Sequence, residues 1–387
     1  MSKILFVTSY PLEYNTSANV RNLGLIEGFI ANNHEVSTCS LYPTDINLYS
    51  GTLIQGMFKD RYWIGGESHQ QVSAKPSKRG KWHNYLRAKI ANLYNYFSIY
   101  DRRKAQVRKV SALDIKETFD VIISSSDPKS AHLFAEELLK KNPKISSRWI
   151  QYWGDPFSDD ISCSRFMGNM RVKREEFRLI KLASKVVYVS PFTADDIKKK
   201  YPEISSKIEF YPIPYRLSIS PKKGFVFNKD IVIGYTGDYN SRNRNILPLY
   251  EALNGTNYKS YIVGNSDIKL KSTENIIVKE RLFGDEFKRV SDEINIVVCI
   301  CNLHGTQIPG KVYHCVNTGK PILIIVDGEN SKALTNYFAG YDRFYTCDNN
   351  ANTILACIEK IIKDKKSFNT PVSLNPLYIA QKFIQPV

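Results

Sequence analysis

Short apolar segments alternate with helical patterns and polar loops in both halves of the chain. The order is the same in each half: strand, polar loop, helix, strand. These segments cover 3–9, 10–19, 20–32 and 35–41 in the first half, and 230–236, 237–244, 245–253 and 261–264 in the second, with another strand at 276–278. Apolar strands that alternate with helices are typical of parallel sheets. The pattern therefore predicts an α/β protein with two doubly wound, Rossmann-like domains.

The segments between these two starts complete the first sheet and define the domain limits. They comprise a helix at 130–140 and strands within 120–128, 148–156, 185–190 and 208–212. A proline-containing stretch follows, which suits an interdomain linker. We expect a first domain at 1–214, a linker at 215–229, a second domain at 230–373 and a C-terminal helix at 374–387 that can cross back to the first domain. Ligands of doubly wound sheets bind outside the carboxyl ends of the strands, so a cleft lined by both domains is expected.

A segment near the end of the chain carries the strongest chemical signal. It reads as a buried strand at 294–300, a polar loop, a helix at 309–318 and a second strand at 322–326. Pro309 suits the first helical position and Gly319 a helix stop. A helix that starts beyond a parallel strand offers free N–H groups to an anion, and Lys311 in its first turn can meet the same anion. Gly310 then allows a close backbone approach. An ordinary crossover with Lys311 in solvent stays open at this point.

The stretch from Gly305 to Lys311 also resembles a phosphate-binding loop of the form GxxxxGK[ST]. Its last position is Val312, so the hydroxyl that would hold Mg²⁺ is missing. Pro309 removes a backbone donor that a phosphate cradle needs. A P-loop NTPase or kinase is therefore the rival interpretation and not the preferred one.

Composition and charge add a second candidate surface. The net charge is +16, and residues 75–110 hold eleven Lys and Arg against Asp101 alone. Aromatic and aliphatic residues recur there at helical spacing, which is typical of a helix on an anionic membrane surface. A core-facing stripe with a solvated charged face is the alternative. No nucleic-acid motif accompanies the charge, so nucleic acid is not expected as a partner.

Other features of the sequence indicate the cellular compartment and the cofactors that the protein is expected to lack. The chain has seven Cys, and those at 299, 301 and 315 fall in apolar elements, which indicates reduced core residues. No apolar run is long enough to span a bilayer, and the N-terminus lacks the layout of a signal peptide, so a cytoplasmic protein is expected. There is no GxGxxG, no Asp-x-Asp and no HExxH. These absences make a mechanism without metal or NAD the default expectation.

Four groups of segments, in order along nearly the whole chain, resemble a known family. They are 3–36, the loops at 124–132 and 149–157, the strand end at 188–193, and Gln307-Ile-Pro-Gly-Lys-Val-Tyr-His with Gly319-Lys-Pro-Ile. The chain is similar here to retaining glycosyltransferases of the GT-B architecture, in the family-four branch that builds bacterial lipopolysaccharide and capsule. Two departures stand out. Thr306 and His314 occupy the places of two glutamates that relatives often carry, and Ser17-Ala18-Asn19 replaces a glycine pair.

The resemblance implies sugar transfer from a UDP- or GDP-linked donor to a glycan or lipid-linked glycan, with retained anomeric configuration and no cofactor. It implies a place on the cytoplasmic face of the inner membrane, where residues 75–110 can meet anionic lipid. Lys311 and Arg242 are expected to stabilise the leaving diphosphate, because preorganised cations do this without a metal. Asp155 and Asp127, which end strands of the first domain, are expected to orient the acceptor hydroxyl or accept its proton. The expected substrate contacts are Asn19, Ser126, Gly237, Arg244, Thr306, Gln307, Gly310 and His314.

Plain structural roles remain as alternatives for several of these residues. Asp127 and Asp155 both precede proline, so turn chemistry alone explains them. For Arg242 and Arg244 the alternative is an ordinary solvated turn. A non-catalytic membrane- or polyanion-binding protein would use residues 75–110 and leave the strand ends idle.

Overall fold

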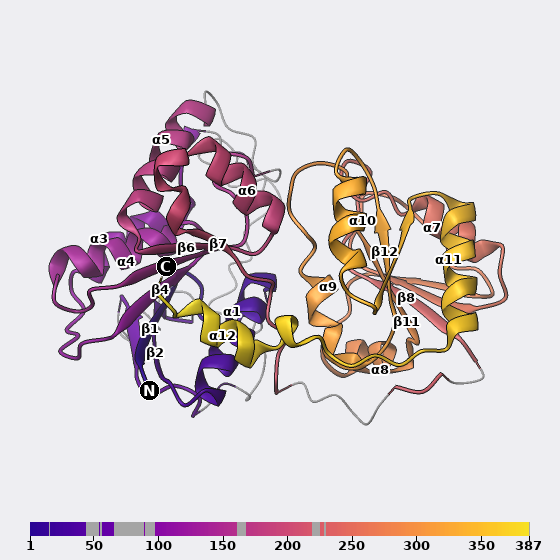
Figure 1. The fold of residues 1–387 in the computed structure, drawn as a ribbon, viewed down its shortest axis with the longest axis horizontal. Helices are drawn as coiled ribbons and strands as arrows, with labels where there is room; N and C mark the ends of the chain where they lie inside the picture. Colours follow the sequence, from indigo (N-terminus) through magenta and orange to yellow (C-terminus); the bar gives the residue numbers. More distant parts are fainter. Residues whose placement is uncertain are drawn as a thin grey trace. The chain divides into compact units, whose positions relative to one another are not determined.

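The structure is a computed structural model of the 387-residue chain. It describes residues 1–14, 16–43, 54, 56–65, 89, 97–160, 168–218, 225–227 and 230–386. The chain forms two compact units. Unit 1 is Met1–Ser218 with Pro376–Val387, and unit 2 is Ile219–Asn375 (Figure 1).

Unit 1 is built on a parallel sheet of seven strands in the order β3-β2-β1-β4-β5-β6-β7. In that order the strands are Arg61–Ile64, Glu35–Leu41, Lys3–Thr8, Val121–Ser125, Trp149–Trp153, Lys185–Tyr188 and Ile208–Phe210. The apolar residues of the interior strands β1, β4, β5 and β6 are buried, as expected for parallel strands covered on both faces, whereas the edge strands β3 and β7 are partly exposed. The chain reverses its direction of travel across the sheet between β1 and β4. The carboxyl ends of these neighbouring strands therefore form the switch point where ligands of such sheets bind.

In the described part of unit 1 the helices are α1 (Ser17–Ala31), α3 (Val107–Val110), α4 (Ser130–Lys141), α5 (Gly168–Leu182), α6 (Pro191–Lys200) and α12 (Pro376–Phe383), with 3₁₀ segments η4 (Arg102–Gln106) and η5 (Pro202–Lys207). Helix α1 begins three residues before the predicted position because the Thr16 side chain caps it, accepting the N–H of Asn19. Helix α12 packs on α1, with the rings of Phe29 and Phe383 6.1 Å apart.

Unit 2 is a parallel sheet of six strands in the order β10-β9-β8-β11-β12-β13. In that order the strands are Ile276–Lys279, Lys259–Val263, Val232–Thr236, Ile296–Ile300, Ile322–Val326 and Phe344–Asp348. The switch point lies between β8 and β11. The helices are α7 (Leu247–Asn254), α8 (Gly284–Glu293), α9 (Lys311–His314), α10 (Ser331–Ala339) and α11 (Ala351–Asp364), with 3₁₀ segments η6 (Val316–Thr318) and η7 (Val372–Leu374).

The helix predicted at 309–318 is shorter in the structure. Only α9 is α-helical, and the chain continues into η6 before Gly319 ends it in the left-handed conformation that favours glycine. The N–H of Val312 donates to the Pro309 carbonyl, and the N–H groups of Tyr313 and His314 donate to Gly310. These main-chain donors are used within the turn. The predicted anion site would therefore rest on the N–H groups that precede Val312, those of Gly310 and Lys311, and it stays a prediction.

The connection out of unit 1 is tied to α1. The predicted linker begins at 215, but Arg216 is buried and its Nε donates to Glu27 at 2.7 Å. The same carboxylate accepts the N–H groups of Leu217 and Ser218. Residues 215–218 therefore fold with unit 1.

Gly24 allows this connection to lie against α1, which leads to a stability prediction. A Cβ at Gly24 would overlap the Pro214 carbonyl oxygen and lie 2.8 Å from that of Tyr215. We expect Gly24→Ala to lower the free energy of unfolding by about 1–3 kcal/mol, the usual range for overpacking. Gly255→Ala is the matched control, since its Cβ would meet nothing closer than 3.6 Å. Urea denaturation of both variants measures the difference, and equal midpoints would contradict the prediction.

The basic stretch at 75–110 lies largely outside the described residues, so its predicted helix is not addressed by the structure. Its described end begins at Phe97, which is 52% exposed. Tyr100 turns inward, and its hydroxyl donates to Glu175 at 2.7 Å. None of the described helices is long and apolar enough to cross a membrane.

Candidate functional site

Lys311 is the central residue of the candidate site in unit 2. Its ammonium donates to both the carbonyl and the hydroxyl oxygen of Thr236, the last residue of β8. The Phe287 ring centroid lies 5.3 Å from the same nitrogen. Burial lowers the pKa of Lys311, and the thiols of Cys315 and Cys299 oppose that shift only in part. Lys311 makes no ion pair with any carboxylate of the described residues.

Arg244 is the second cation at this switch point. Its Nε donates to the Asn302 side-chain oxygen at 2.8 Å, just beyond β11, and a second guanidinium nitrogen lies 3.3 Å from the Asp238 carbonyl. Burial raises the pKa of the Cys299 thiol, while Lys311 and Arg244 both act on it in the opposite sense. The two cations thus flank the end of β11. Arg242, predicted as the catalytic arginine of this loop, is exposed instead.

Gln307 is the clearest unsatisfied group of unit 2. The residue is 9% exposed, and neither atom of its side-chain amide has a hydrogen-bond partner in the described structure. Its main-chain carbonyl oxygen accepts a hydrogen bond from the Asn302 side-chain amide at 3.4 Å. A buried amide without partners is costly, so a water or ligand is expected to complete it. Thr306, Gly310 and His314 lie on the same segment and are partly exposed.

Gly237 has a backbone role at the end of β8. Its N–H donates to the Val263 carbonyl at 2.8 Å, and its own carbonyl approaches Gly264 so closely that a Cβ there would overlap it. Beside it, Asp238 pairs with Arg281. This packing fixes the loop that carries Arg244.

Unit 1 gathers charged side chains where β4 and β5 end. Lys129 is 6% exposed and pairs with Asp127, while its Nζ lies 3.5 Å from Asp160. Arg21 of α1 donates to the Ser126 carbonyl and to the Ser125 hydroxyl. A Cβ at Gly154 would overlap its guanidinium, so a larger residue there would displace the Arg21 side chain.

Asp155 has the most perturbed carboxyl of this group. Burial raises its pKa to about 6, and repulsion from Asp127 and Asp160 adds to the shift, against the attraction of Lys129 and Arg21. It accepts no hydrogen bond from any described residue. Burial lowers the pKa of Lys129, but the attraction of Asp127, Asp160 and Asp155 outweighs it and the net shift is upward. Lys129 therefore stays charged beside a carboxyl that titrates near neutral pH.

Two predicted substrate contacts have structural roles instead. Ser126 is fully buried, and its hydroxyl accepts the Gly154 N–H at 3.3 Å. Asn19 is 2% exposed, and its amide nitrogen donates to the carbonyls of Pro11 and Tyr14 at 2.7 and 2.9 Å. Both side chains shape loops and are closed off from a substrate in this conformation.

Three members of the unit 1 group were not predicted, namely Arg21, Lys129 and Asp160. Each lies in a segment whose pattern suits an ordinary helix face or loop. Lys129 and Asp160 lie within five residues of the predicted Asp127 and Asp155, and this proximity is the one feature of the sequence that could have indicated them. Nothing in the sequence marks Arg21, because its partner at Ser126 is 105 residues away.

These two groups have different chemical capacities. The cations of unit 2 suit an anion that brings its own charge, because a desolvated ammonium without a carboxylate is otherwise unfavourable. The carboxyl of Asp155 suits proton acceptance near neutral pH. No three His, Cys, Asp or Glu among the described residues lie where they could hold a metal ion.

No family model and no curated protein matches the chain, but solved structures do. TarM aligns with a TM-score of 0.57 at 12% identity over 99% of this chain and 94% of that one. UDP-GlcNAc 2-epimerase from Methanocaldococcus jannaschii aligns at 0.54 and 10% identity over 99% and 98%. A glycosyltransferase from Rickettsia africae ESF-5 aligns at 0.51 and 12% identity over 98% and 92%.

At these identities the likeness shows the fold alone. The chain has the GT-B fold, with two Rossmann-like units that each contain a parallel sheet, which confirms the predicted fold class. The P-loop interpretation loses support, because the segment after Lys311 is the four-residue α9 and not the long helix that such a loop opens.

Proposed function

We propose that this protein is a glycosyltransferase that moves a sugar from a nucleotide-sugar donor to a glycan or lipid-linked glycan. One observation carries the proposal. The Lys311 ammonium is partly buried at the end of β8, burial lowers its pKa, and it has no carboxylate partner among the described residues. Burying a charge is expensive unless an opposite charge meets it, so an anionic ligand is expected at this position. The diphosphate of a nucleotide sugar supplies that charge.

In this proposal unit 2 stabilises the leaving group. As the sugar–phosphate bond breaks, negative charge grows on the departing diphosphate. Lys311 and Arg244 are fixed by Thr236 and Asn302 before the reaction, so little reorganisation is needed when that charge develops. Arg244 takes the role predicted for Arg242, since it is the arginine held at the switch point.

Unit 1 acts on the acceptor in the same proposal. The Asp155 carboxylate orients the acceptor hydroxyl or receives its proton, and Lys129 and Arg21 partly offset the repulsion that Asp127 and Asp160 exert on it. The sequence resemblance extends the proposal to retention of configuration, metal independence and a role in cell-surface polysaccharide synthesis. We also propose that residues 75–110 contact an anionic membrane face on the cytoplasmic side.

Nucleotide binding is the first test, and we expect UDP or GDP to raise the melting temperature by a few degrees. A ligand at about 100 times its Kd adds about 2.7 kcal/mol to stability. Differential scanning fluorimetry with UDP, GDP, ADP and ATP, each with and without EDTA, measures this. Stabilisation by ATP alone, and only with Mg²⁺, would instead support an NTPase. No shift with any of the four would remove the proposed donor site.

The fold neighbours include an epimerase, so the activity assay must separate two reactions. A radiolabelled UDP-sugar is incubated with and without a membrane glycolipid fraction. Transfer of label to the lipid phase supports the proposal. Conversion of the donor to its 2-epimer without an acceptor would contradict it.

A further inference from the structure

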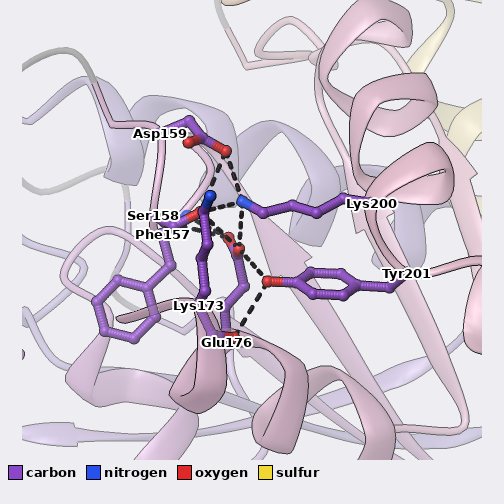
Figure 2. A network of polar contacts seen from close by, with 7 residues as sticks. All are labelled: Phe157, Ser158, Asp159, Lys173, Glu176, Lys200 and Tyr201. Atoms are coloured by element: carbon purple, nitrogen blue, oxygen red, sulfur yellow. Dashed lines mark hydrogen bonds and ion pairs between the residues drawn. The ribbon is translucent and has the colours of Figure 1, made fainter. Parts of the chain in front are cut away.

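Glu176 of α5 is a fully buried carboxylate that receives five hydrogen bonds from neighbouring segments (Figure 2). Its Oε1 accepts the backbone N–H groups of Phe157 at 2.6 Å and Ser158 at 3.3 Å. Its Oε2 accepts the Ser158 hydroxyl at 2.8 Å, the Tyr201 hydroxyl at 2.9 Å and the Lys200 ammonium at 3.3 Å. One side chain thus joins the β5–α5 loop to the C-terminal end of α6.

The remaining contacts strengthen the same loop. Lys200 also pairs with Asp159 at 2.6 Å, and the Ser158 hydroxyl lies 3.1 Å from that carboxylate. The Tyr201 hydroxyl lies 3.1 Å from the Lys173 carbonyl, one turn of α5 before Glu176. The loop from Phe157 to Asp159 is therefore held by backbone, hydroxyl and charged contacts together (Figure 2).

Both ends of this loop reach the charged group of unit 1. Asp155 lies two residues before Phe157, and Asp160 follows Asp159. The Asp160 carboxylate is 3.5 Å from the Lys129 ammonium, which also pairs with Asp127. The position of the loop therefore sets the distance between Asp155 and the charges that face it, which are Asp127, Lys129, Asp160 and Arg21.

A carboxylate network is an unusual way to fill a core. Apolar side chains of similar volume often replace buried ion pairs at no loss of stability, while a satisfied polar network can hold one arrangement. We propose that Glu176 is a positioning residue, which fixes the β5–α5 loop so that Asp155 and Asp160 are correctly placed around Lys129. This inference deepens the proposed function and rests on it for the part that concerns turnover.

The test compares Glu176→Leu with Glu176→Gln. Leucine removes all five hydrogen bonds, whereas glutamine keeps an oxygen for the two backbone N–H groups. We expect Glu176→Leu to lower kcat for transfer at least tenfold with the donor KM unchanged within about twofold. Glu176→Gln should recover most of that loss. A merely structural residue would affect the amount of folded protein and leave kcat per folded molecule intact.

The second readout needs no activity. The Asp155 carboxyl is titrated by ¹³C NMR in the wild type and in both variants. Release of the loop admits water and moves Asp160 away from Asp155. The titration midpoint of Asp155 should therefore fall by about one pH unit in Glu176→Leu. An unchanged midpoint, or an unchanged kcat in folded Glu176→Leu, would overturn the inference. If the leucine variant does not fold, Tyr201→Phe combined with Lys200→Met takes its place, with the same direction expected.

These outcomes separate the two proposals. A wild type that transfers no sugar and binds no nucleotide contradicts the proposed function, while a shifted Asp155 midpoint in the variants still supports the positioning role. Conversely, if the wild type is active and the Glu176 variants keep its kcat and its Asp155 titration midpoint, only the present inference is overturned.

Discussion

Replacing Lys311 with methionine is expected to lower the rate of sugar transfer by about tenfold to hundredfold without destabilising the ligand-free protein. A charge-assisted contact to a developing anion contributes about 1.5–3 kcal/mol, which sets that range. In the free protein the same ammonium is partly buried, and among the described residues its partners are the two Thr236 oxygens and the Phe287 ring. Removing it relieves a desolvation penalty, so stability should hold or rise.

Lys320→Met is the matched control for this experiment. Lys320 is a second partly buried lysine of unit 2, and its ammonium donates to the Ser291 carbonyl at 2.7 Å. Burial lowers its pKa too, but it serves the end of α8 and not the switch point. We expect it to change stability and to leave nucleotide binding intact. Thermal scans with and without UDP, with kcat for each variant, give the comparison. Full turnover in Lys311→Met would remove this residue from the mechanism.

Most interior strands were predictable because short, largely apolar segments stand between polar or turn residues. β2 and β12 have the predicted bounds, and each is buried in its interior. The edge strand β3 was missed. Only Ile64 of its four residues is buried, so it lacks the apolar run that marks an interior strand. Pairing with β2 determines this strand, and a local pattern cannot show such pairing.

The site was predictable only at strand ends. Lys311, Asp127 and Asp155 follow or end predicted strands, so topology alone placed them beyond the carboxyl ends of strands. Their partners come from distant segments, as with Thr236, which is 75 residues from Lys311. Whether a side chain faces a substrate or its own loop is set by such long-range contacts. This explains why Asn19 and Ser126 were assigned to substrate while the structure uses them to hold loops.

The choice between Arg242 and Arg244 shows the same limit. The two residues lie in one turn, and the sequence offered no reason to separate them. The turn closes through paired hydrogen bonds between Asn240 and Arg244, which directs Arg244 toward Asn302 and leaves Arg242 exposed. The path of the backbone through the turn decides which of the two side chains is exposed, and only the folded turn fixes it.

The transfer rate is expected to fall as the pH drops below about 6, because Asp155 must be ionised to accept a proton. Asp155→Asn should lower kcat by about a hundredfold, the usual scale of general-base catalysis, and should abolish the fall of the rate at low pH, the acid limb of the pH profile. Lys129→Met should move this acid limb to higher pH, since Lys129 favours the charged form of Asp155. Profiles of kcat between pH 4.5 and 8.5 for the three proteins measure these effects, and an acid limb that survives in Asp155→Asn would assign it to another group.

Stability should respond to pH in the opposite direction from activity. The pKa of Asp155 in the folded protein, about 6, lies above its ordinary value of 3.8. Between these values the folded state binds the proton and the unfolded state does not, so this group alone adds stability as the pH falls from about 6 towards 4. Asp155→Asn removes that contribution, and urea midpoints at pH 7 and pH 5 should therefore shift less toward acid stability in the variant than in the wild type. At neutral pH Asp155 is ionised although its charge lowers the stability of the folded protein. Such a cost is typical of catalytic carboxylates, whereas the charge of a structural carboxylate stabilises the fold.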